Sequence, residues 1–350
     1  MKIDEAKIQE IYEALPEPLL AWYRGSARDL PWRRDREPYH VWLSELMLQQ
    51  TRVEAVKLYY TRFLAELPTV EALAATPEEK LLKLWEGLGY YNRARNLQKA
   101  ARAVVQEYGG RFPDSCETLL SLPGIGAYTA GAVASICFEW PSPAVDGNVL
   151  RVLARLCLDF RCVDTPEVKR DVTQRLAAIY PEGHCGDFSQ ALMELGAVVC
   201  VPNGAPKCDA CPLARLCLAR QSQKEQDLPV KAKKKSRKIQ TLTVFVLRCP
   251  QGTALCKRGP AGVLSGLWEL PNVEGFLPEA AAFRTAANWG VLPEYVEKRV
   301  ERRHIFTHIE WHMRCYFIAC AHPSEQFFWA EPAALENDIA LPTAFKKILE

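Results

Sequence analysis

The chain has 350 residues, of which 49% are hydrophobic and 25% are charged, as in an ordinary soluble globular protein long enough for two domains. Its formal net charge is only +2, so overall basicity gives no argument for nucleic-acid binding. The N-terminal residues are charged, and no apolar run reaches the ~18 residues of a membrane span. We therefore expect a cytoplasmic protein without a targeting or membrane segment, and its 13 cysteines do not predict a disulfide framework there.

The first part of the chain is predicted to be helical, because apolar residues recur at helical spacing from Ile3 to about Arg220. One helix is predicted over His40–Val53, where Glu45 shares a face with Trp42, Leu46 and Gln49. Partial burial on that face would raise the pKa of Glu45 and keep its proton available at neutral pH. The alternative is an exposed acid on an amphipathic helix.

The segment LPGIGAYTAG predicts a tight turn before a helix that starts near Tyr128. Gly124 and Gly126 tolerate positive φ, and the turn exposes backbone N–H groups at the start of a helix, where a phosphate can bind. Taken alone, the motif also fits a generic helix–helix connection.

Asp146 precedes a helix predicted over Val149–Leu156. The helix dipole at that position favours an ionised carboxylate. The residue type and position fit a plain N-cap equally well.

Four cysteines fall within 18 residues, with the spacing C-x7-C-x2-C-x5-C: Cys200, Cys208, Cys211 and Cys217. Their loop is rich in proline and offers little core in which thiols are buried by chance. Four thiolates in one loop predict a metal site, either a [4Fe–4S] cluster or a structural zinc.

Residues 222–238 have the polar, charged composition of a solvated linker. Six of the eight residues 231–238 are basic: Lys231, Lys233, Lys234, Lys235, Arg237 and Lys238. After the linker, β-branched and aromatic runs predict strands at residues 241–247, 254–257 and 313–319, with helices at 279–289 and 344–349. We therefore predict an α+β domain over residues 239–350.

These motifs together resemble the iron–sulfur branch of the helix-hairpin-helix glycosylase superfamily. The segments LPWRRDREPYHVWLSELMLQQTRVEAV, GLGYYNRARNL, LSGLWELP and RHIFTH resemble its MutY family of adenine glycosylases more closely than its endonuclease III relatives. The resemblance implies a helical domain over 1–221 with a six-helix module at about 30–137. It also implies an iron–sulfur module at about 1–29 and 138–221, holding a [4Fe–4S] cluster. One departure is the first cysteine gap of seven residues, one more than the commoner pattern.

The resemblance implies a monofunctional glycosylase of base-excision repair that acts as a monomer on double-stranded DNA. It would flip adenine out of A:8-oxoguanine or A:G pairs and hydrolyse the N-glycosidic bond. Glu45 would protonate adenine, and Asp146 would stabilise the positive charge on the sugar. Tyr128 stands where endonuclease III has the lysine that forms a Schiff base, so we expect no strand cleavage.

The resemblance also implies residues that contact DNA or the two bases, although core packing is the alternative for Trp32, Leu88 and Tyr90. Leu30, Trp32, Arg33 and Gln190 would shape the adenine pocket, while Gln50, Leu88 and Tyr90 would wedge around 8-oxoguanine. Thr51, Gly124 and Gly126 would contact the DNA. Phe306, Thr307 and His308 match the family's F-S-H loop and would read the lesion, though a histidine beside Trp311 is otherwise often a packed one.

The second domain is expected to resemble the Nudix fold without its hydrolase activity, because the run Arg284–Asn288 lacks the acidic metal ligands. Two other readings remain open: an endonuclease III-like lyase acting on oxidised pyrimidines, and a non-catalytic damage-binding protein. Tyr128 disfavours the lyase, and the presence of both Glu45 and Asp146 disfavours the binding protein.

Overall fold

The computed structural model describes residues 4–233 and 236–350, which fall into two compact units. The first unit comprises the described residues up to Ala75 together with Asn96–Lys233, and the second comprises Thr76–Arg95 together with the residues from Ser236 onward. The sequence prediction had assigned Thr76–Arg95 to the first domain, and its domain limits stay a prediction. Lys234 and Lys235 of the basic linker lie outside the described residues. None of the described helices is long and apolar enough to cross a membrane.

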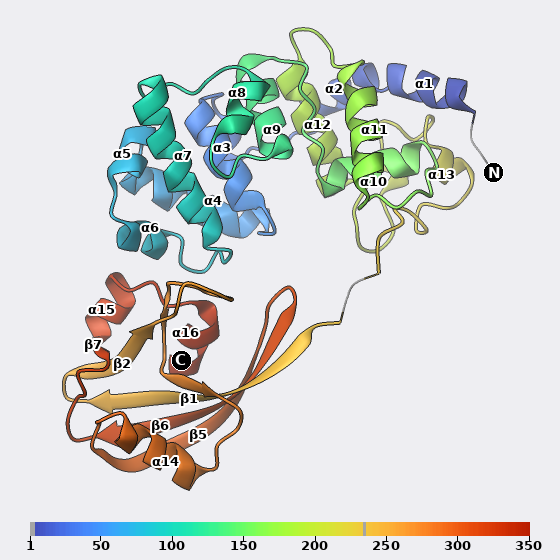
Figure 1. Ribbon diagram of the computed structural model, residues 1–350. Helices are drawn as coiled ribbons and strands as arrows, with labels where there is room; N and C mark the ends of the chain where they lie inside the picture. The colour runs from blue at the N-terminus through green and yellow to red at the C-terminus, as the bar shows by residue number, and fades with distance from the viewer. Residues whose placement is uncertain (1–3, 234–235) are drawn as a thin grey trace. The chain divides into compact units, whose positions relative to one another are not determined.

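The first unit is helical, as predicted (Figure 1). Its helices before the second unit's segment are α1 (Glu5–Glu13), α2 (Pro16–Ser26), the 3-10 turn η1 (Pro31–Arg33), α3 (Pro38–Leu48), α4 (Val53–Glu66) and α5 (Val70–Ala75). Helix α7 (Asn92–Tyr108) enters the unit at Asn96. It is followed by α8 (Cys116–Ser121), α9 (Ala127–Phe138), α10 (Gly147–Leu156), α11 (Pro166–Ala177), α12 (Cys185–Val198), η2 (Cys208–Ala210) and α13 (Leu218–Gln221).

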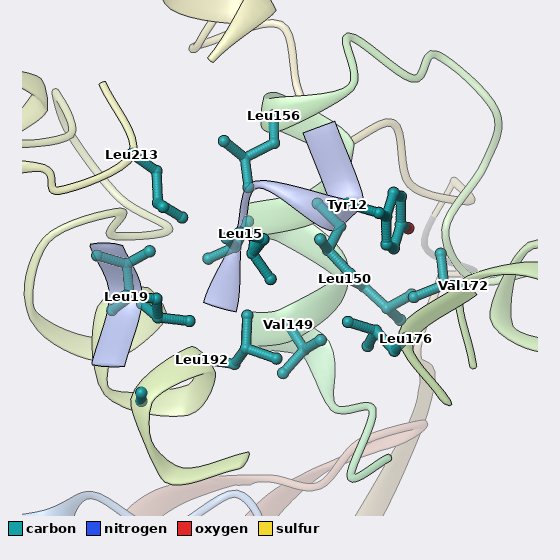
Figure 2. Packing of buried hydrophobic residues seen from close by; sticks show 14 of the residues in the cluster. Tyr12, Leu15, Leu19, Val149, Leu150, Leu156, Val172, Leu176, Leu192 and Leu213 are labelled. Carbon is teal, nitrogen blue, oxygen red and sulfur yellow. The ribbon is translucent and has the colours of Figure 1, made fainter. Parts of the chain in front are cut away.

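One apolar core joins the start of the chain to helices far along it (Figure 2). Leu15 and Leu19 pack there with Leu150 and Leu192, which come from α10 and α12. Burying a leucine side chain stabilises a fold by roughly 2 kcal/mol. This core therefore fixes the positions from which α10 and α12 present their polar residues.

Helix α3 is the central helix of the unit, with eight of its eleven residues buried. It packs against α9, which is also largely buried. The predicted helix over His40–Val53 differs from the observed helix at both ends, because α3 begins at Pro38 and ends at Leu48. The chain leaves the helix after Leu48, because Gln49 has a non-helical ψ of 110° and Gln50 then adopts a left-handed φ of 60°. A new helix begins at Val53.

The second unit is α+β, as predicted. Its seven-stranded sheet has the order β3-β2-β1-β6-β5, with β4 paired to β1 and β7 paired to β2. The strands are β1 (Lys238–Cys249), β2 (Gly252–Lys257), β3 (Trp268–Glu269), β4 (Asn272–Glu274), β5 (Pro293–Ile305), β6 (Ile309–Cys320) and β7 (Phe328–Ala330). The helices are α6 (Glu78–Leu84), α14 (Glu279–Asn288), α15 (Pro332–Asn337) and α16 (Thr343–Leu349).

Both faces of the sheet are covered by helices (Figure 1). Phe345 of α16 lies in the core on one face, and Ala282 and Ala286 of α14 lie in the core on the other. The long strand β5 was not predicted, because it is an edge strand whose residues are mostly exposed and charged. It forms an antiparallel hairpin with β6.

Candidate active site

A cavity of about 570 Å³, lined by both apolar and polar side chains, opens in the first unit. Nine of the residues predicted for the site line it: Leu30, Trp32, Arg33, Glu45, Gln50, Thr51, Tyr128, Asp146 and Gln190. They come from η1, the end of α3, the turn after it, the start of α9, the residue before α10, and α12. Residues up to 160 positions apart in the sequence therefore meet in one place.

Glu45 is almost completely buried on α3, with a relative exposure of 6%. Burial, together with the charge of nearby Asp146, raises the pKa of its carboxyl to about 7. The hydrogen bond from Tyr128 and the charge of Arg33 act in the opposite direction. Glu45 therefore holds a proton near neutral pH, as predicted from its face of the helix.

Tyr128 lies in the first turn of α9, and its hydroxyl donates a short hydrogen bond to Oε2 of Glu45. Its oxygen also lies 3.2 Å from Sδ of Met193. Burial and the charge of Glu45 raise the pKa of Tyr128 well above its ordinary value. The phenol thus stays neutral and can act on Glu45 only through a hydrogen bond.

Asp146 is the N-cap of α10, and three donors face its carboxylate. The backbone N–H groups of Asn148 and Val149 each donate at 2.8 Å, and Nδ2 of Asn148 donates at 2.7 Å. Burial nevertheless raises the pKa of Asp146, because the loss of solvent outweighs the favourable hydrogen bonds.

The side chain of Asn148 connects Asp146 to a buried arginine. Its Oδ1 accepts a hydrogen bond of 2.9 Å from Nη2 of Arg151, whose Nε donates to the carbonyl oxygen of Cys200 at 2.8 Å. Arg151 is only 4% exposed. A continuous set of polar contacts therefore fixes Asp146 relative to the start of the cysteine loop.

The sequence prediction missed an ion-pair cluster at the edge of the cavity. Glu194, whose side chain is fully buried, accepts hydrogen bonds from Arg28 at 2.6 Å and from Arg33 at 2.8 Å. Although burial alone would raise it, these two guanidinium groups lower the pKa of Glu194 to about 2. Glu194 is 161 residues from Arg33 and 166 residues from Arg28. No local sequence pattern connects residues so far apart, so the ion pairs could not be predicted from the sequence.

The turn between α8 and α9 exposes backbone at the start of a helix, as predicted. Gly124 has a φ of 75°, and a Cβ there would lie 2.6 Å from Cβ of Asn96. Gly126 is the N-cap of α9 and has an ordinary negative φ of −94°. Only Gly124 requires glycine for its conformation.

The remaining predicted contacts lie in the second unit, where two of them meet. Tyr90 is 49% exposed, and its hydroxyl lies 2.8 Å from Oγ1 of Thr307. Phe306, Thr307 and His308 form the turn between β5 and β6. Thr307 and His308 are exposed, while Phe306 packs edge-on against Trp311. Leu88 is buried at 7% exposure.

The four clustered cysteines line one cavity in the first unit together with Lys207 and Arg220. Nη1 of the buried Arg155 lies 3.2 Å from Sγ of Cys200. Among the described residues, no three cysteine, histidine or carboxylate side chains converge closely enough for a single metal ion. The four cysteines line one cavity, and four thiols are a donor set that could bind either a [4Fe–4S] cluster or a structural zinc.

Comparison with known proteins matches both units. The profile of the HhH-GPD superfamily of base excision DNA repair proteins matches residues 43–178, and that of the NUDIX domain matches residues 243–350. The adenine DNA glycosylase of Homo sapiens is 37% identical over 86% of this chain and 66% of its own length. This chain thus spans about two thirds of the human protein. The adenine DNA glycosylase of Buchnera aphidicola is 31% identical over 95% of both chains.

Solved structures resemble the helical part of the chain. A thermostable thymine-DNA glycosylase has a TM-score of 0.54 and 30% identity, covering 61% of this chain and 98% of its own. A non-covalent endonuclease III–DNA complex has a TM-score of 0.52 and 26% identity, covering 63% of this chain and 99% of its own.

Proposed function

The chain belongs to the adenine DNA glycosylase family, and we propose that it hydrolyses the N-glycosidic bond of adenine paired with 8-oxoguanine or guanine in duplex DNA. The observation that carries the proposal is the carboxyl pair of buried Glu45 and partly buried Asp146, in one cavity with Tyr128. An adenine flipped out of the duplex would enter this cavity.

The two carboxyl groups take different roles: one carries a proton and the other is ionised. Glu45 and Asp146 repel each other when both are ionised, so the pair tends to keep one proton. Asp146 faces three N–H donors, which favour a carboxylate, while Glu45 faces the neutral phenol of Tyr128. We therefore assign the proton to Glu45 and the negative charge to Asp146.

The reaction then follows from these positions. Glu45 gives its proton to a ring nitrogen of adenine, and the bond to the sugar breaks with its electron pair going to the base. The carboxylate of Asp146 stabilises the positive charge left on the sugar. A water molecule adds to the anomeric carbon and returns a proton to Glu45, which restores the acid.

The same cavity supports a monofunctional enzyme. A lyase needs an amine that forms a Schiff base with the sugar. No lysine is among the described residues that line the cavity, and a phenol such as Tyr128 cannot replace it. The product would be an intact strand with an abasic site.

When adenine leaves the duplex, its partner base is left unpaired. Gln50 and Tyr90 have exposed side chains that could contact this base, whereas Leu88 is buried in the turn between α6 and α7. Thr307 and His308 lie exposed at the tip of the β5–β6 hairpin and offer a hydroxyl and an imidazole to 8-oxoguanine. The contact between Tyr90 and Thr307 supports a shared role in reading the lesion.

The four cysteines of the loop would hold a [4Fe–4S] cluster, for which their shared cavity has the suitable donor set. When bound, the cluster would act as a structural cross-link of the loop. Arg155 would keep Cys200 in place through its contact with the sulfur atom.

A substrate panel tests the proposal. Single-turnover base release is measured on duplexes containing A:8-oxoguanine, A:G, A:C, T:G or thymine glycol, and the strands are resolved with and without alkali. We expect adenine release from the first two, with strand breaks only after alkali. Release confined to thymine glycol, or breaks without alkali, would contradict the proposal.

A further inference from the structure

We propose that Arg93 is a positioning residue that holds the ring of Tyr90 in the orientation in which it meets the lesion. This inference rests on the proposed function of Tyr90. It depends on the turn of the second unit between α6 and α7, where the contacts of Arg93 with Trp85, Leu88, Gly89 and Tyr90 are local in sequence.

The backbone of this turn is strained at Tyr90. Gly87 and Gly89 have φ values of 98° and 69°, which glycine adopts without cost. Tyr90 has a φ of 47°, a left-handed conformation that is unfavourable for a residue with a side chain. The surrounding contacts must hold Tyr90 in this conformation.

Arg93 supplies two of these contacts through one nitrogen. Its Nη2 donates to the carbonyl oxygens of Leu88 at 3.0 Å and Gly89 at 3.2 Å. The backbone N–H of Arg93 donates to the carbonyl oxygen of Tyr90 at 2.8 Å. The side chain and backbone of one residue thus bind the carbonyl groups of three consecutive turn residues.

The guanidinium group of Arg93 also contacts two aromatic rings. Its carbon lies 5.4 Å from the ring centroid of Trp85 and 5.5 Å from that of Tyr90. Trp85 is fully buried and its Nε1 donates to the carbonyl oxygen of Gly89 at 3.1 Å, so it forms a fixed base for the turn. Cation–π contacts of this kind are stronger when they are partly desolvated, as they are here.

Arg93 remains a cation in this environment. Burial lowers the pKa of its guanidinium group to about 10, well above neutral pH. The hydroxyl at the far end of Tyr90 contacts Thr307 at 2.8 Å. Tyr90 is therefore held at two points, by Arg93 at the ring face and by the hairpin turn at the hydroxyl group.

Fluorine NMR of the DNA-free protein labelled with 3-fluorotyrosine tests the positioning without any reaction. The Tyr90 resonance is assigned by its loss in Tyr90→Phe. We expect Arg93→Gln to shift or broaden it, Arg93→Lys to change it less, and the control Arg102→Gln on the same helix to leave it unchanged. An unaltered resonance in Arg93→Gln would overturn the inference, whether or not the protein releases adenine.

A double-mutant cycle tests the consequence for recognition. Binding is measured to a duplex carrying a non-cleavable adenine analogue opposite 8-oxoguanine. We expect Arg93→Gln to weaken binding about tenfold in the wild-type background but less than about twofold in Tyr90→Ala, since Arg93 acts through that ring. Equal losses in both backgrounds would mean a general structural role and would refute the assignment. Arg93→Lys is used in the same cycle if Arg93→Gln does not fold, as judged by circular dichroism.

Discussion

At the scale of single residues, the chemistry depends on the different protonation states that burial and hydrogen-bond partners give to two carboxyl groups. Glu45 and Asp146 are both carboxylic acids with restricted solvent access, and the pKa of each is raised mainly by burial. Asp146 differs in having three N–H donors, while Glu45 has one phenol. The neighbours, and not the residue types, determine which group carries the proton.

Replacing Glu45 by Gln should abolish base release and also change stability in a pH-dependent way. The pKa of Glu45 is raised from 4.5 to about 7, so the stability of the wild type is full below about 4.5 and is partly lost as the pH rises through 7. Gln does not titrate. The variant should therefore gain relative stability, by at most about 3 kcal/mol, between pH 5 and pH 8.

Thermal unfolding at the two pH values measures this difference. The exposed Glu13→Gln on α1 is the control and should show no such gain. If Glu45→Gln changes the melting temperature by the same amount at pH 5 and pH 8, Glu45 is not a buried acid of raised pKa.

At the scale of elements, the turn between α8 and α9 depends on one glycine more than on the other. Gly124→Ala places a Cβ at a φ of 75° and within 2.6 Å of Cβ of Asn96, whereas Gly126 has open space and an ordinary negative φ. We expect Gly124→Ala to lower stability by roughly 1–2 kcal/mol and to weaken binding to duplex DNA. Gly126→Ala should have a much smaller effect on stability. Equal losses in chemical denaturation would contradict this account of the turn.

The sequence predicted most elements, because their apolar periodicity survives in the fold. It predicted the helical first part, the core strands β1, β2 and β6, and helices α14 and α16. The prediction failed where an element is exposed to solvent or where its end is determined by local backbone geometry. The edge strand β5 has no alternating apolar pattern, and the break after Leu48 depends on the left-handed φ of Gln50.

Within the site, prediction was best for residues in recognisable motifs. Glu45, Tyr128 and Asp146 meet in one cavity as the resemblance implied. Arg28, Met193 and Glu194 were missed, since their roles arise from contacts across the fold. The cluster of Glu194 with its two arginines is fixed by tertiary packing, which no local sequence signal reports.

At the scale of the whole molecule, the cysteine loop and the core of α1, α2, α10 and α12 belong to one unit. If the loop holds a [4Fe–4S] cluster, the purified protein should contain about four iron atoms per chain. Cys200→Ser should lower the iron content and the visible absorption. Cys162→Ser is the matched control, because Cys162 does not line that cavity. One zinc and no iron, or equal iron in both variants, would contradict the assignment.

The central claim is that a protonated Glu45 starts the release of adenine. The most direct test is the single-turnover rate of adenine release from an A:8-oxoguanine duplex, measured from pH 5.5 to 9. Because the acid must hold its proton and the pKa of Glu45 is about 7, the rate should fall about tenfold per pH unit above that value. A rate that stays constant or rises between pH 7 and pH 9 would contradict the claim.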